Sequence, residues 1–204
     1  MKNKWAVQQL PDGYQFEEKW DLSEDGKAKV YLSLASLGLF ILFWLLFNGL
    51  LQIFRPETNG VVSGFSISLS DPTSMIVSVL VLIFVTVGMV FLHEAIHGLF
   101  FWLFTREKPR FGFKVVYAFA GAPGWYITKL PYILIGIAPL LVITILGLLL
   151  LLIVPEGWIL AVLLFMTMNA SGAAGDIYTV FWLWRKPDNI LVSDSGDSVQ
   201  VFLA

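Results

Sequence analysis

Long apolar runs alternate with short polar segments along the whole chain. Each of four runs is long enough to form a membrane-spanning helix, because a bilayer core about 30 Å thick needs about 20 apolar helical residues. The predicted spans are residues 30–54, 75–105, 132–154 and 157–184. The pattern therefore predicts an all-α membrane protein built as a bundle of four transmembrane helices.

Two of the polar segments predict short β structure. Residues 111–120, between the second and third runs, are rich in aromatic and β-branched side chains and precede the turn signal Gly121-Ala-Pro-Gly124. They predict a short cytoplasmic strand or β-hairpin. Residues 189–203 predict a strand, a turn at Ser195-Gly196 and a second strand. For this tail, a regulatory role and no functional role are both open.

Composition agrees with a membrane protein and excludes several other classes. The chain has 204 residues, of which 57% are hydrophobic and 14% are charged, whereas soluble domains have about 25% charged residues. A net charge of −2 without a basic stretch excludes a nucleic-acid partner. The absence of cysteine excludes disulfides, thiolate metal sites and cysteine nucleophiles.

The distribution of lysine and arginine predicts the orientation, because these residues favour the cytoplasmic side. The N-terminal segment has five, the first loop one, the middle loop five, the third loop none and the tail two. We therefore expect a multi-pass protein of the cell membrane with both termini in the cytoplasm. The expected parts are a cytoplasmic N-terminal segment (1–29), a four-span membrane core (30–184) and a cytoplasmic tail (185–204).

The two histidines of the chain lie in the second run, as His93-Glu94-Ala95-Ile96-His97. This spacing places both imidazoles on one face of a helix, where they can share a metal ion. Glu94 is then close enough to act on a metal-bound water, which is the pattern of zinc hydrolases. The alternative is a packed histidine pair. It does not explain a carboxylate in mid-span, which costs at least about 2.5 kcal/mol.

Zinc needs a third protein ligand, and Asp176 is the candidate. Glu94 and Asp176 are the only acids inside the four runs. His93 lies 18 residues from Met75, and Asp176 lies 18 residues from Trp158, near the outer start of each run; this is about 27 Å in an unbroken helix. They therefore have similar depths, displaced toward the cytoplasm. Small residues before Asp176 favour close helix contact; simple helix packing is the alternative.

Two further residues stand out in the third and fourth runs. Asn169 lies seven residues before Asp176, on nearly the same face of an unbroken helix. It is a candidate donor to a substrate carbonyl or an oxyanion, and an interhelical hydrogen bond is an equal alternative. Pro139 is predicted to kink the third helix.

The chain resembles site-2 proteases, a class of intramembrane zinc metalloproteases. The resemblance lies in Phe91-Leu-His-Glu-Ala-Ile-His-Gly98, Ala122-Pro-Gly-Trp-Tyr126, and Asn169 followed by Gly175-Asp176. More closely, the chain is similar to a family of small bacterial membrane proteins described as putative zincin peptidases. The likeness implies that His93, His97 and Asp176 bind Zn²⁺. It also implies that Glu94 is the catalytic base and that Asn169 helps to hold the substrate.

These observations predict a zinc-dependent peptidase that acts within or at the cytoplasmic edge of the membrane on a membrane-protein substrate. Regulated intramembrane proteolysis is the expected setting, with the lipid bilayer as the surroundings. The alternative is a non-catalytic, metal-stabilised membrane scaffold or partner-binding protein. A transporter is disfavoured, because the intramembrane acids and histidines cluster in one site and no inverted repeat is visible.

Overall fold

A computed structural model describes residues 4–21, 26–58, 71–114, 117–196 and 198–204. Its helices are α1 (Gly26–Phe54), the 3₁₀ turn η1 (Pro56–Thr58), α2 (Pro72–Thr105), α3 (Lys129–Leu151), α4 (Glu156–Gly172) and α5 (Ala174–Trp184). Its strands are β1 (Ala6–Val7), β2 (Gln15–Asp21), β3 (Arg110–Lys114), β4 (Tyr117–Gly121), β5 (Tyr126–Thr128), β6 (Ile190–Asp194) and β7 (Ser198–Leu203).

Three helices, α1, α2 and α3, are long and apolar enough to cross a membrane. Their outward-facing side chains agree with a lipid environment: Phe84 of α2, for example, is 79% exposed. Exposed apolar surface on this scale is unfavourable in water but not in lipid. The chain is therefore a helical membrane protein.

The fourth predicted run is not one straight helix. It forms α4 and α5, which meet at Ala173 with a bend of 41° and together are long and apolar enough for one span. The expectation of an unbroken helix is wrong here. Glycines on both sides of the break, Gly172 and Gly175, lower the helix propensity locally. The described residues thus contain three spans, or four if the bent pair is one span.

The structure contains more β structure than an all-α protein. Five antiparallel strands form a sheet in the order β1-β5-β6-β7-β2, and β3 and β4 form a separate two-stranded sheet. The predicted hairpin at 111–120 is confirmed as β3–β4, although residues 115–116 of its turn lie outside the described residues. The tail is confirmed as the hairpin β6–β7. The N-terminal strand β2, which the sequence did not predict, pairs with β7.

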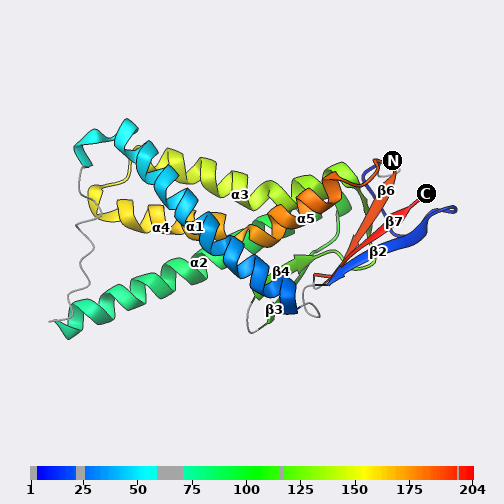
Figure 1. The fold of residues 1–204 in the computed structure, drawn as a ribbon, viewed down its shortest axis with the longest axis horizontal. Coiled ribbons are helices and arrows are strands. Elements are labelled where there is room, and N and C mark those ends of the chain that lie inside the picture. The colour runs from blue at the N-terminus through cyan, green and yellow to red at the C-terminus, as the bar shows by residue number, and fades with distance from the viewer. Residues whose placement is uncertain (1–3, 22–25, 59–70, 115–116, 197) are drawn as a thin grey trace.

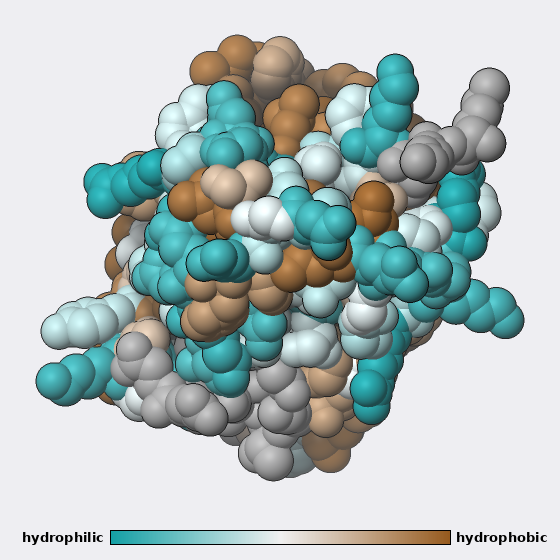
Figure 2. Space-filling view, turned by 90° about the vertical axis from the view of Figure 1, so that its right-hand side faces the viewer, coloured by the Kyte–Doolittle hydropathy of each residue, from teal (hydrophilic) through white to brown (hydrophobic). Residues whose placement is uncertain are grey.

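The five-stranded sheet and both chain termini lie at one end of the helices, and the turn between α3 and α4 lies at the other (Figure 1). Figure 2 looks onto the sheet end and shows hydrophilic side chains gathered over it. Beneath this surface, the sheet and the adjoining helix ends share one apolar core, which includes Phe101, Ile127, Leu183, Val192 and Val201. This core holds together the ends of α2, α3 and α5 that adjoin the sheet.

Candidate metal centre

His93 and His97 lie in the C-terminal half of α2, one helical turn apart, and both side chains are buried. Their Nε2 atoms approach each other to 3.2 Å. The predicted sharing of one helix face therefore brings the two imidazoles to a common point.

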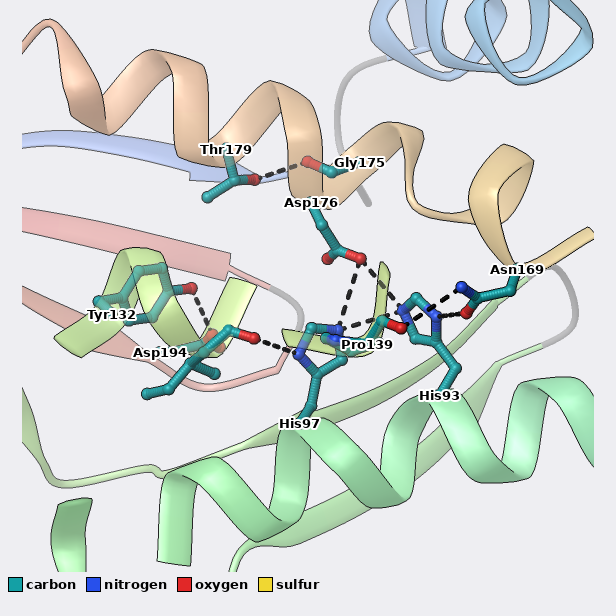
Figure 3. A network of polar contacts seen from close by, with 10 residues as sticks. His93, His97, Tyr132, Pro139, Asn169, Gly175, Asp176, Thr179 and Asp194 are labelled. Carbon is teal, nitrogen blue, oxygen red and sulfur yellow. Dashed lines mark hydrogen bonds and ion pairs between the residues drawn. The ribbon is translucent and has the colours of Figure 1, made fainter. Parts of the chain in front are cut away.

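Asp176, in the first turn of α5, reaches the same point from another helix (Figure 3). Its Oδ2 lies 3.1 Å from Nε2 of His93 and 3.5 Å from Nε2 of His97. One ligand atom from each of the three residues lies within 4.8 Å of the others, an arrangement that could hold a metal ion. The structure thus brings together the three residues that the sequence selected by spacing and depth.

The other nitrogen of each imidazole faces an oxygen atom that accepts hydrogen bonds. Nδ1 of His93 lies 2.9 Å from Oδ1 of Asn169, and Nδ1 of His97 lies 3.0 Å from the carbonyl oxygen of Ile135. Both Nδ1 atoms therefore carry protons, and both Nε2 atoms present lone pairs to the shared point. Two imidazole lone pairs and a carboxylate oxygen so close together require a positive charge between them.

This donor set fits zinc. Two imidazole nitrogens and one carboxylate oxygen are ligands that zinc binds in catalytic sites, where three protein ligands leave one position for water. Each imidazole is also held through its second nitrogen, as is usual for metal-binding histidines.

Glu94 lies beside this centre and outside the group of three. Its Oε2 is buried and has no hydrogen-bond partner among the described residues. The backbone of Ala120, in β4, lies next to the carboxylate. A buried carboxylate oxygen without a donor is costly, so this position is suited to a group that meets a bound water or substrate.

Asn169 is completely buried and lies against His93 rather than facing the cavity. Its Nδ2 donates to the carbonyl oxygen of Pro139 at 3.4 Å. The interhelical hydrogen bond, one of the two alternatives for this residue, is present. A direct contact with substrate stays a prediction.

A cavity of about 440 Å³ opens at the metal centre. Besides His93, Glu94, His97 and Asp176, its walls include residues from β2, α1, α3 and the tail hairpin that sequence analysis did not select as site residues. They are Trp20 of β2, Ser33 and Ser36 of α1, Tyr132 of α3, and Asp194, Gly196 and Val199 of the tail hairpin. The polar residues among them belong to no recognisable sequence motif, so the sequence alone does not identify them as site residues.

Asp194, at the end of β6, is buried, with 7% of its surface exposed. It accepts hydrogen bonds from the hydroxyl of Tyr132 at 2.5 Å and from the backbone N–H of Gly196 at 2.6 Å. Burial raises the pKa of its carboxyl to about 6, although these hydrogen bonds act in the opposite direction. Gly196 has φ +94°, and a Cβ there would meet the Phe119 ring at 2.1 Å, so only glycine suits this turn.

The comparison with known families agrees with this geometry. Residues 86–191, more than half of the chain, match the family described as "Putative zincin peptidase". The chain belongs to this family. Searches of curated proteins and of solved structures gave no match.

Membership in the zincin peptidase family points to a zinc-dependent peptidase. The matched part of the chain contains all the metal-ligand candidates together with Glu94, Tyr132 and Asn169. The walls that β2, α1 and β7 add to the cavity lie outside it. The resemblance to small zincin peptidases is thus confirmed.

Proposed function

We propose that this protein is a zinc-dependent peptidase that cleaves membrane proteins within the membrane or at its cytoplasmic edge. The observation that carries the proposal is the convergence of His93, His97 and Asp176 beside Glu94, whose Oε2 has no hydrogen-bond partner among the described residues. These residues would hold zinc. When bound, the ion would supply a Lewis acid and make water a competent nucleophile near neutral pH.

In this proposal Glu94 is the general base. Its carboxylate takes a proton from the attacking water and later gives a proton to the leaving amide nitrogen. The buried environment of Oε2 suits this exchange, because no protein donor among the described residues competes for it. Asn169 orients His93 through its Oδ1, and we propose no direct step for it.

The depth of the site supports cleavage in or near the bilayer. His93 lies 12 residues before the inner end of α2 at Thr105, which is about 18 Å along the helix. We propose that α4 and α5 together form the fourth span, so that both termini lie in the cytoplasm of a cell-membrane protein. Residues 30–184 would then be the metalloprotease core.

A transmembrane substrate hides its amides in its own helix and must unwind before it can be cut. We propose that the unwound segment pairs with the edge of β4, whose Ala118, Phe119 and Ala120 line the cavity. We propose that the protein works as an intramembrane protease of the site-2 type, in regulated intramembrane proteolysis.

The test is Glu94→Gln in purified protein, with quenched-fluorescence single-span peptides in lipid vesicles as the probe. A peptidase predicts that the variant keeps its zinc and loses cleavage by a factor of at least about 100. Wild type that holds zinc but cuts no peptide supports the alternative of a metal-stabilised scaffold. Undiminished cleavage by the variant would contradict the role of Glu94.

A further inference from the structure

Pro139 lies in the middle of α3, and it alters the hydrogen bonds of this helix. Proline has no backbone N–H, so the carbonyl oxygen four residues earlier loses its helical donor. That carbonyl belongs to Ile135, a residue with 2% of its surface exposed. A buried carbonyl without a partner is unfavourable, so another donor is expected at this position.

His97 is that donor. Its Nδ1 lies 3.0 Å from the Ile135 oxygen, and both groups are buried. The proline ring also clashes with the carbonyl of Ile135, four residues earlier, and turns it away from the helix axis. The same residue thus frees the acceptor and favours its outward direction. With an ordinary residue at 139, the new N–H would compete with His97 for this oxygen.

Pro139 also contributes to the second imidazole. Its own carbonyl accepts a hydrogen bond from Nδ2 of Asn169 at 3.4 Å, and Oδ1 of Asn169 faces Nδ1 of His93 at 2.9 Å. Figure 3 shows the resulting chain of contacts from α3 to both histidines. The region around one proline therefore holds both rings from behind, opposite Asp176.

We propose that Pro139 is a positioning residue of the metal centre. By leaving the Ile135 carbonyl free, it fixes the proton of His97 on Nδ1 and directs the Nε2 lone pair toward Asp176. The inference rests on the proposed zinc centre and adds a third helix to it, although no α3 side chain is among the metal-ligand candidates. Outer partners of this kind change metal affinity by about 10–100-fold when removed.

The first experiment measures zinc affinity by competition with a chromogenic chelator in detergent. Pro139→Ala and Pro139→Gly both restore the N–H, and each is expected to weaken zinc binding by about 10–100-fold. Pro131→Ala is the matched control, because Pro131 lies in the first turn of α3, where a missing N–H has no helical acceptor. Its affinity should equal that of the wild type. Far-UV circular dichroism checks that each variant keeps its helices.

The second experiment uses ¹⁵N-labelled histidine in the zinc-loaded protein, whose chain has only two histidines. In the wild type, Nδ1 of His97 should carry a proton that exchanges slowly with water. In Pro139→Ala this proton should exchange faster, while the His93 signal changes less.

The outcomes separate the two proposals. Wild type that binds no zinc overturns the zinc centre itself. Wild type that binds zinc through Nδ1 of His97 overturns the role of Pro139 without any variant. Equal zinc affinity and equal proton exchange in wild type and both Pro139 variants also overturn it, while the zinc centre stands.

Discussion

The hydroxyl of Tyr132 donates a hydrogen bond to Oδ2 of Asp194, with 2.5 Å between the two oxygen atoms. The contact joins the first turns of α3 to the end of β6, across 62 residues of sequence. Both side chains are buried and line the cavity of the metal centre. The C-terminal hairpin is therefore part of the site's architecture, which neither interpretation of the tail from sequence included.

Removing this hydroxyl should destabilise the protein. Tyr132→Phe leaves a buried carboxylate oxygen without its donor, and the expected loss in the free energy of unfolding is about 1–3 kcal/mol. Denaturant unfolding in detergent provides the measurement. Tyr178→Phe, at a tyrosine with 44% of its surface exposed, is the control and should change stability by less than about 0.5 kcal/mol. Equal stability of the Tyr132 variant and the wild type would contradict the prediction.

Asp194 should make stability depend on pH. Its pKa is about 6 in the folded protein against an ordinary value of 3.8, so the folded state binds the proton more tightly than the unfolded state. The protonated Asp194 carboxyl contributes its full stabilisation of the folded state below pH 3.8, and this contribution is lost as the pH rises through about 6. This shift corresponds to about 3 kcal/mol in full.

The measurement compares wild type with Asp194→Asn between about pH 4 and about pH 7, because the asparagine does not titrate. As the pH rises, the unfolding free energy of the variant should increase relative to that of the wild type. A difference that stays constant, or that moves in favour of the wild type, would show that Asp194 is not held in this environment.

Asp176→Asn should weaken zinc binding. The substitution keeps the size of the side chain but removes the negative charge that faces both imidazoles at 3.1 and 3.5 Å. We expect at least about a 10-fold loss of affinity, measured by metal analysis after dialysis against a buffered zinc solution. Glu156→Gln, in the first turn of α4 at the far end of the same bent pair, should retain the wild-type zinc content. Full occupancy in Asp176→Asn would remove this residue from the centre.

Removing the metal should loosen the helix bundle. The three candidate ligands come from α2 and α5, and their partners come from α3 and α4. An ion present at 100 times its dissociation constant stabilises the folded state by about 2.7 kcal/mol. A strong chelator should therefore lower the thermal midpoint of the wild type. The midpoint of a His93→Ala, His97→Ala double variant should not respond, and an equal response from both proteins would point to an unspecific effect of the chelator.

Much of the metal centre was predictable because helix geometry links residue spacing to position. The spacing of His93 and His97 places them on one face, and the equal depth of Asp176 allows it to reach them. The bend at Ala173 was not predictable from length and hydropathy, because α4 and α5 together are still long and apolar enough for one span. The hydrogen bond between His97 and the Ile135 carbonyl was also not predictable, because a sequence does not show which backbone carbonyls are available as acceptors. The one local sign is Pro139, which removes the helical donor of this carbonyl.

The sheet was only partly predictable, for a different reason. Strands β6 and β7 flank a Ser-Gly turn and pair with each other, so their pairing is local and visible in the sequence. Strand β2 is mostly exposed and carries four charged residues among seven. Its pairing with β7 depends on a contact between opposite ends of the chain, and local patterns contain no information on such contacts.

That pairing has a consequence for biosynthesis. In the described sheet β2 is an edge strand and pairs only with β7, so a strand that precedes the helices α1 to α5 finds its neighbour in a strand that follows them. The helices can insert while translation continues, but the wall of the cavity that contains Trp20, Asp194 and Val199 forms only once β7 has been synthesised. A polypeptide that ends before β7 would therefore contain His93, His97 and Asp176 but would lack one wall of the cavity around them.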